Sequence, residues 1–158
     1  MKFLRKVFFK ILEFLITSDR QKIQEPIIHS TQLSLGQFNY SKKSLQNLHT
    51  TNKKLQNLFN IVISKVDCTI LEGQRGKVRQ DMLFEKEKTK VKYPNSKHNR
   101  FPSMAIDVAP YPIDWDNEKR FYEFANIVFK EAKKLNIKIK WGGNWQTFKD
   151  YVHWEIED

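Results

Sequence analysis

The sequence is poor in cysteine and has no long uncharged hydrophobic run. Cys68 is the only cysteine, so no disulfide can form within the chain. Cysteine usage therefore does not indicate whether the protein works in an oxidising or a reducing compartment. Its strand-like surroundings favour a buried small apolar side chain over a nucleophile. No uncharged stretch reaches the ~18 residues that a membrane-spanning helix needs. The N-terminus also lacks an apolar region followed by small residues, so we expect no cleaved signal peptide.

The formal net charge is +10, and almost all of the excess lies in residues 1–90. These residues hold 17 of the 28 Lys and Arg side chains but 8 of the 18 Asp and Glu side chains. This asymmetry suggests an anionic partner, and nucleic acid, anionic lipid and wall polymers are all compatible with it. A lysine-rich composition that only aids solubility is the alternative. With 40% hydrophobic and 29% charged residues, the chain is expected to be globular.

Residues 1–17 are typical of a basic amphipathic helix. Apolar side chains recur there at helical spacing, at Leu4, Val7, Phe8, Ile11, Leu12 and Leu15. Such a helix can lie on an anionic membrane surface, and the alternative is that it packs on its own domain. A polar linker containing Pro26 follows it. We therefore expect an N-terminal helix and linker over residues 1–35 and a main domain over residues 36–158.

The remaining chain alternates between helical and strand-like periodicity. Helices are predicted over residues 41–65, 77–87 and 117–135. An interruption at residues 49–52 divides the first of these, with Thr51 or Asn52 as an N-cap, and Asp116 is expected to cap the last. Strands are predicted over residues 68–71, 104–109, 137–141 and 152–156. This order predicts an α+β fold with a small antiparallel sheet flanked by helices.

Asp107 interrupts the otherwise apolar strand Met104-Ala105-Ile106-Asp107-Val108-Ala109. A carboxylate buried there is costly without a partner, and a metal ion is a strong partner. His98 precedes it by nine residues across a loop, and His153 lies in the last strand. Two imidazoles and one carboxylate are the ligands of a catalytic zinc whose fourth position is left for water. The alternatives are an aspartate paired with lysine or arginine and a histidine satisfied within the core.

Two further side chains are candidates for proton transfer and charge stabilisation. Asp150 precedes His153 by three residues, so it can act as general base toward a metal-bound water and then protonate the leaving amine. An ordinary turn aspartate is the alternative. Arg75 follows the first strand between two glycines and can stabilise an oxyanion, the alternative being an exposed arginine.

These residues stand in ordered motifs that resemble the zinc peptidases comprising D-Ala-D-Ala carboxypeptidases, D-Ala-D-Ala dipeptidases and phage L-alanyl-D-glutamate endopeptidases (endolysins). The resemblance spans about Phe38 to the C-terminus. Its parts are Ser41-x-x-Ser44-x-x-Asn47-Leu48, residues 67–76 with Gln80, Ser96-Lys97-His98, residues 105–110, Trp141-Gly142-Gly143-x-Trp145 and Asp150-x-x-His153-Trp154-Glu155. The step from His98 to Asp107 is longer than the family's, so the extra residues must bulge. Asn144 also replaces a common aspartate.

The resemblance implies that His98, Asp107 and His153 bind one zinc ion. It also implies that Asp150 is the acid and base, and it matches Arg75 to the arginine of the family. The remaining motif positions, with roles in supporting the ligands or contacting substrate, are Ser96, Gln80, Glu155 and Trp141.

On this resemblance, the expected function is hydrolysis of the L-Ala–D-Glu bond in the stem peptide of peptidoglycan. The short chain without a cleaved signal favours the endolysin branch, made in the host cytoplasm and acting on the cell wall. The expected partners are the stem peptide and an anionic membrane surface at residues 1–17, with no nucleic acid and a monomeric chain. One alternative is a D-Ala-D-Ala carboxypeptidase or dipeptidase with the same site. Another is a non-catalytic basic protein that binds the envelope or nucleic acid.

Overall fold

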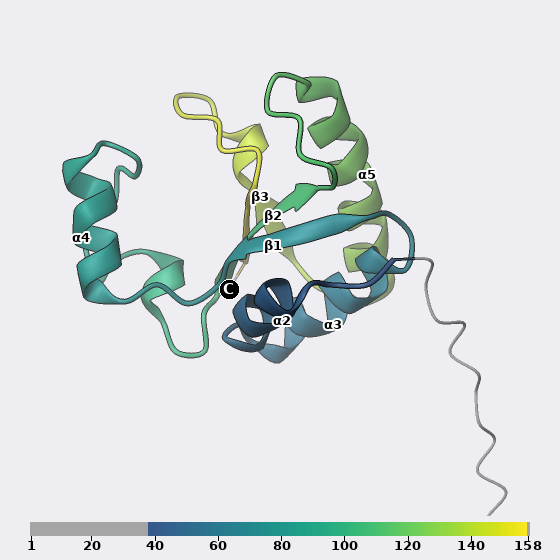
Figure 1. Ribbon diagram of the computed structural model, residues 1–158, viewed down its shortest axis with the longest axis horizontal. Coiled ribbons are helices and arrows are strands. Elements are labelled where there is room, and N and C mark those ends of the chain that lie inside the picture. Colours follow the sequence, from purple (N-terminus) through teal and green to yellow (C-terminus); the bar gives the residue numbers. More distant parts are fainter. Residues whose placement is uncertain (1–37, 158) are drawn as a thin grey trace, which may run out of the picture. The chain divides into compact units, whose positions relative to one another are not determined.

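The computed structural model describes residues 38–157, which fold around one four-stranded antiparallel sheet. Its strands are β1 (Cys68–Glu72), β2 (Ala105–Pro110), β3 (Ile139–Trp141) and β4 (His153–Ile156), in the spatial order β1-β2-β4-β3. The helices are α2 (Lys42–His49), α3 (Lys53–Ile63), α4 (Lys77–Glu85) and α5 (Glu118–Lys134), with the short 3-10 helices η1 (Lys97–Asn99) and η2 (Gly142–Asn144). Figure 1 shows the helices around the sheet, which confirms the predicted α+β fold. The predicted helix over residues 1–17 and the boundary at residue 35 lie outside the described residues and stay predictions.

The two faces of the sheet have different chemistry. Successive side chains along a strand point to opposite faces, and residues paired across two strands share a face. Ile106 pairs with Trp154, and the next pair is Asp107 with His153. The first pair therefore belongs to the apolar face and the second pair to the polar face. The sheet separates the hydrophobic core from the candidate metal ligands.

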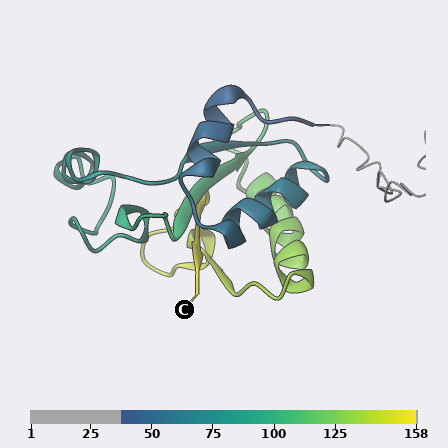
Figure 2. The same ribbon diagram turned by 90° about the horizontal axis from the view of Figure 1, so that it is seen from below.

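Trp154 of β4 lies at the centre of the core and is fully buried. Its ring makes edge contacts with Phe59 of α3 and with Phe124 and Phe129 of α5, at centroid distances of 6.2, 6.3 and 5.4 Å. It also stacks on Trp141 of β3 at 5.7 Å. Figure 2 shows α3 and α5 side by side. Because aromatic pairs add about 0.5–1.5 kcal/mol each beyond their burial, this cluster holds β4 firmly against the helices.

Side-chain caps fix where two of the helices begin. Asn52 accepts a hydrogen bond from the first turn of α3, which confirms the predicted interruption and cap. The expected cap of α5 is wrong by one residue. Asn117, rather than Asp116, accepts the Arg120 backbone N–H at 3.3 Å. Asp116 lies in the turn before the helix, where its backbone N–H donates to the Asp114 carboxylate at 3.3 Å.

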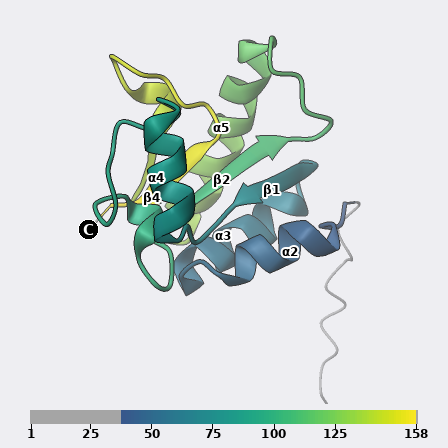
Figure 3. The same cartoon turned by 60° about the vertical axis from the view of Figure 1, so that its left-hand side comes forward.

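Helix α4 differs from the other helices because Gln80 is its one buried side chain. Figure 1 shows this helix standing apart from α3 and α5, and Figure 3 shows it from the side on which it comes to the front. The sequence of α4 also has no amphipathic stripe. The helix is held by the polar contacts of Gln80 rather than by an apolar face. Among the described residues, no helix has the length and apolarity to cross a membrane.

Candidate active site

Asp107 and His153 face each other across β2 and β4, and η1 brings His98 to the same point. His98 Nε2 lies 3.2 Å from both Asp107 Oδ1 and His153 Nδ1. The remaining distance, from His153 Nδ1 to Asp107 Oδ1, is 3.3 Å. All three side chains are buried. The structure therefore brings together the three ligands that the sequence predicted.

The spacing of these three atoms fits a bound metal ion. A tetrahedral ion bound at about 2.0–2.1 Å holds its ligand atoms about 3.3 Å apart. Ordinary hydrogen bonding explains the arrangement less well. If each neutral imidazole keeps its proton on the nitrogen that faces Gly73 or Glu155, no proton is left for the three atoms that face one another. The cluster can hold a metal ion, and its nitrogen and oxygen donors suit a borderline cation.

Each imidazole is oriented by an oxygen on its far side. His98 Nδ1 lies 2.7 Å from the carbonyl oxygen of Gly73. His153 Nε2 lies 3.2 Å from Glu155 Oε2. An oxygen acceptor at one ring nitrogen fixes the proton there and leaves the other nitrogen free to bind a metal. Glu155 is thus a partner of an imidazole, as the sequence suggested.

Ser96 caps η1, which carries His98, and the residues between His98 and Asp107 form a bulge. Ser96 Oγ accepts the backbone N–H of His98 at 3.3 Å and caps this short helix. The long step to Asp107 is absorbed by a bend in which Phe101 is 87% exposed. The bend is closed at Ser103, whose backbone N–H donates to Thr50 at 2.9 Å. The extra residues therefore bulge outward and leave His98 in place.

Charges within the cluster shift the ionisation of its members. Burial raises the pKa of Asp107, but His98 and His153 outweigh it and hold this pKa well below its usual range. Burial lowers the pKa of His153, yet its hydrogen bonds to the Asp107 and Glu155 carboxylates raise this pKa overall to about 9. The hydrogen bond with His153 lowers the pKa of Glu155. The carboxylates thus stay charged beside the imidazoles.

Asp150 lines an open cleft together with His98 and His153, and its pKa shifts in the opposite direction to those of Asp107 and Glu155. Burial, followed by the nearby Asp107 carboxylate, raises the pKa of Asp150. Its backbone is held by Gly142, whose carbonyl accepts the Asp150 N–H at 3.1 Å. A Cβ on Gly142 would lie 2.4 Å from the Asp150 carbonyl oxygen, so glycine is required for this approach. A carboxyl with a raised pKa beside a metal site suits proton transfer.

Arg75 is buried and makes ion pairs rather than being exposed. Its guanidinium donates to Glu72 Oε2 at 2.6 and 2.9 Å and to Asp107 Oδ2 at 3.2 Å. A third donor reaches Gln80 Oε1 at 3.2 Å. Arg75 thus holds the oxygen of Asp107 that does not face the histidines. The pairing of Arg75 with Glu72 was not predicted from the sequence, although a glutamate three residues before an arginine is a signal for such a pair.

Trp141 and Trp145 occupy different environments. Trp141 packs in the core, and its indole N–H donates to the carbonyl oxygen of Tyr151 at 2.9 Å. Trp145 lines the cleft, with its ring centroid 5.1 Å from that of His153. Trp145 is therefore the tryptophan of this motif that can contact a substrate. Its place after the glycine pair was the signal for it.

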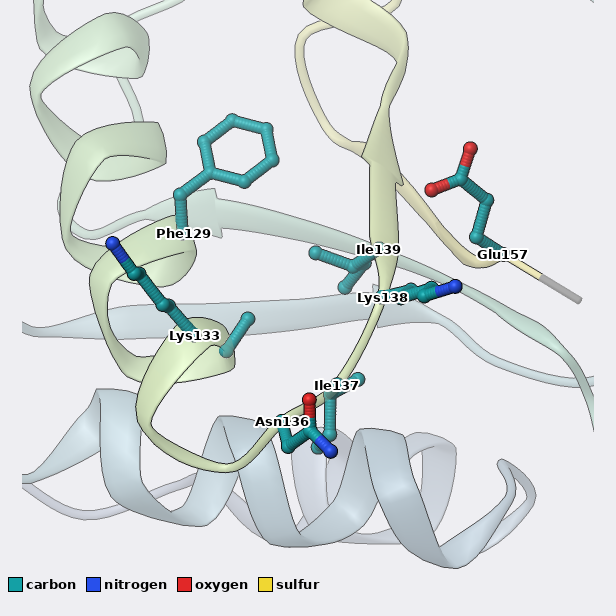
Figure 4. Close-up of a pocket in the computed structure, with 8 residues that line it drawn as sticks. Phe129, Lys133, Asn136, Ile137, Lys138, Ile139 and Glu157 are labelled. Atoms are coloured by element: carbon teal, nitrogen blue, oxygen red, sulfur yellow. The ribbon is translucent and has the colours of Figure 1, made fainter.

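Two of the three candidate metal ligands, His98 and His153, line a cleft of about 470 Å³. It is lined by Arg75, Lys88, Thr89, Lys90, Val91, Asn95, Ser96, Lys97, His98, Trp145, Thr147, Phe148, Asp150, His153 and Glu155. A second pocket, of about 340 Å³, lies between the end of α5 and β3 (Figure 4). Its lining includes no histidine and one carboxylate, Glu157, which pairs with Lys140. The first cleft is therefore the candidate active site.

A buried His-Asp-His cluster beside a carboxyl of raised pKa, at the wall of an open cleft, is typical of a metal-dependent hydrolase. The family model for phage L-alanyl-D-glutamate peptidase matches residues 36–158. The chain belongs to this family, which confirms the resemblance read from its motifs.

Individual relatives agree with this assignment. The L-alanyl-D-glutamate peptidase of Escherichia phage T5 is 30% identical over 125 residues, covering 76% of this chain and 90% of that protein. The peptidoglycan L-alanyl-D-glutamate endopeptidase CwlK of Bacillus subtilis is 33% identical over 104 residues, covering 58% of this chain and 61% of that protein. The crystal structure of the L-Ala D-Glu endopeptidase ChiX of Serratia marcescens shares the fold, with a TM-score of 0.64 and 23% identity over 77% of this chain and 92% of that chain.

Proposed function

We propose that this chain is a zinc-dependent endopeptidase that hydrolyses the L-Ala–D-Glu bond in the stem peptide of peptidoglycan. The observation that carries the proposal is the convergence of His98 Nε2, Asp107 Oδ1 and His153 Nδ1 at 3.2–3.3 Å, in a chain of this peptidase family. The bond itself is the one in the names of the phage T5 and Bacillus subtilis relatives.

His98, Asp107 and His153 would hold the zinc ion, two through nitrogen and one through oxygen. When bound, zinc supplies a Lewis acid and, by lowering the pKa of water toward ~7, a nucleophile at neutral pH. Glu155 and the carbonyl oxygen of Gly73 keep the two imidazoles oriented through their other nitrogens.

Asp150 is the proton carrier of the proposal. It accepts the proton of the attacking water and then delivers it to the nitrogen of the leaving D-glutamyl group. Its raised pKa supports both steps, because a carboxyl whose pKa lies closer to the working pH serves better as a base in the first step and still acts as an acid in the second. The proton that Asp150 takes up in the first step is thus the one that it gives to the leaving group in the second.

Arg75 positions Asp107 through the ion pair at 3.2 Å, and Gln80 and Glu72 hold Arg75. The oxyanion role that the sequence suggested for Arg75 stays a prediction. The two roles differ in what the loss of the guanidinium changes first: metal affinity for a positioning role, and turnover for an oxyanion role.

Synthetic stem peptides and purified peptidoglycan test the proposed bond. The zinc-loaded protein is incubated with each substrate, and mass spectrometry identifies the new termini. We expect a new D-glutamyl amino terminus and a new L-alanine carboxyl terminus. Release of terminal D-alanine with the L-Ala–D-Glu bond intact would instead establish a carboxypeptidase. A chain that neither binds metal nor cleaves any peptide would be a binding protein of the envelope.

We also propose where the enzyme is made and where it acts. The name of the Bacillus subtilis relative includes peptidoglycan, and we propose that this chain likewise works on the cell wall, after synthesis in the host cytoplasm. We propose further that residues 1–17 bind an anionic membrane surface and that the chain is monomeric. Residues 1–17 lie outside the described part of the chain.

A further inference from the structure

Two parts of the chain contribute many of the residues that line the active-site cleft. The segment 88–91 follows α4, and the loop 145–150 lies between η2 and β4. The two parts meet where Lys90 Nζ lies 6.0 Å from the ring centroid of Phe148. The lysine side of the cleft is therefore held near the loop that carries Asp150.

Gln80 ties the lysine segment to the metal ligands. This fully buried amide donates to the carbonyl oxygen of Val91 at 2.6 Å. Its own oxygen accepts from Arg75, which in turn donates to Asp107. Each link of this chain is a hydrogen bond of 2.6–3.2 Å. A surface segment anchored to a buried ligand in this way is a defined wall rather than an unconstrained loop.

Four lysine and arginine side chains line the cleft, and two of them have internal carboxylate partners. Arg75 pairs with Glu72 and Asp107. Lys97 lies 3.8 Å from Glu155 Oε1 and donates to a backbone carbonyl of β4 at 2.5 Å. Lys88 and Lys90 form no ion pair within residues 38–157, and both are exposed. The cleft thus presents two ammonium groups that are available to an anionic ligand.

We propose that Lys88 and Lys90 recognise the free carboxylate of the glutamyl residue on the leaving side of the scissile bond. This inference rests on the proposed function. A glutamyl residue joined to the next residue through one of its two carboxyl groups keeps the other as a free carboxylate. That group lies close to the scissile nitrogen, where an ammonium wall in the same cleft can pair with it. The enzyme therefore prefers an unmodified glutamyl residue over one whose carboxylate is amidated.

Two stem peptides that differ only in this group, carboxylate or carboxamide, test the preference. We compare the wild-type chain, Lys88→Ala/Lys90→Ala, Lys88→Glu/Lys90→Glu and the control Lys42→Ala/Lys43→Ala, whose lysines lie on α2 outside the cleft. The measured ratio is kcat/KM for the carboxylate peptide divided by kcat/KM for the carboxamide peptide. We expect Lys88→Ala/Lys90→Ala to lower this ratio about tenfold, mainly through a higher KM for the carboxylate peptide, which is the size of effect that two exposed ion pairs permit. The glutamate pair should lower it further, and the control should keep the wild-type ratio. An unchanged ratio in both cleft variants would overturn the proposal.

Binding measured by calorimetry separates this proposal from the proposed function. Zinc-loaded Asp150→Asn, which should bind peptide without turning it over, is titrated with both peptides, with and without the lysine changes. Tighter binding of the carboxylate peptide that disappears in Lys88→Ala/Lys90→Ala supports the recognition even if the wild-type chain cleaves a different bond. Cleavage at L-Ala–D-Glu without any such difference in binding would overturn the recognition and leave the proposed function standing.

Discussion

Asp107 Oδ1 and His153 Nδ1 lie 3.3 Å apart across a pair of adjacent antiparallel strands. The pairing of β2 with β4 alone brings them to this distance, since paired residues share a face of the sheet. His98 then completes the cluster from η1. Two of the three candidate ligands are thus carried by regularly paired strands, which resist displacement by loop motion.

Removal of the metal should abolish activity and lower stability. A ligand at about a hundred to a thousand times its Kd stabilises the folded state by about 3–4 kcal/mol, so chelation should lower the Tm by about 10 °C. Calorimetric melting with and without a chelator measures the shift, and metal analysis should give about one zinc per chain. His153→Ala and Asp107→Ala should lose the zinc. His49→Ala, on α2, is the matched control that should retain it.

Asp150→Asn should retain zinc and lose about 10²–10⁴-fold in kcat, the range typical of a missing acid–base group. The amide keeps the size of the side chain but cannot carry the proton. Metal content and stem-peptide turnover are measured on the same preparation. The exposed Asp116→Asn serves as the control for loss of one negative charge. Full activity in Asp150→Asn would show that another group moves the proton.

Arg75→Ala should weaken zinc binding about 10–100-fold, the usual effect of losing a group that orients a metal ligand. It also leaves Glu72 and Asp107 without their shared cation, which should destabilise the fold by roughly 1–3 kcal/mol. Competition with a zinc chelator and chemical unfolding measure the two effects. If Arg75→Ala keeps the wild-type zinc affinity and stability while kcat falls, the arginine acts on the oxyanion instead.

Cys68 should resist thiol reagents in the folded protein. Burial raises the pKa of its thiol from 9.0 to about 12, so almost no thiolate exists at neutral pH. Because the folded pKa is the higher one, the contribution to stability is complete below pH 9 and is lost as the pH rises toward 12. Labelling with a chromogenic disulfide should be slow in buffer and complete in guanidinium chloride. Rapid labelling of the native chain at pH 7 would contradict the burial of this strand.

Deletion of residues 1–17 should reduce binding to anionic vesicles without changing the cleavage of soluble stem peptides. The sequence of this segment predicts a basic amphipathic helix, and such helices bind anionic lipid. Co-sedimentation with vesicles of phosphatidylglycerol, compared with neutral vesicles, measures the effect. Equal binding of the full and shortened chains would assign the lipid affinity, if any, to the rest of the basic surface.

Local patterns in the sequence were sufficient for the elements and for the ligand types. Apolar periodicity located the strands and the helices other than α4, because burial of one face imposes it on the residues themselves. Asp107 was conspicuous since a carboxylate in an apolar strand needs a strong partner. The N-cap of α5 fell at Asn117 rather than Asp116, because adjacent side chains that can both cap are distinguished only by the backbone turn before the helix.

The sequence by itself thus determined the α+β class, the family and the identity of the three candidate ligands. The tertiary structure decided what those side chains touch: His153 reaches His98 across 55 positions, and Arg75 reaches Asp107 across 32. It also placed Trp145 in the cleft and Trp141 in the core, although one short motif contains both. Contacts between distant positions depend on strand register and on how loops close, and neither leaves a periodic signal in the chain.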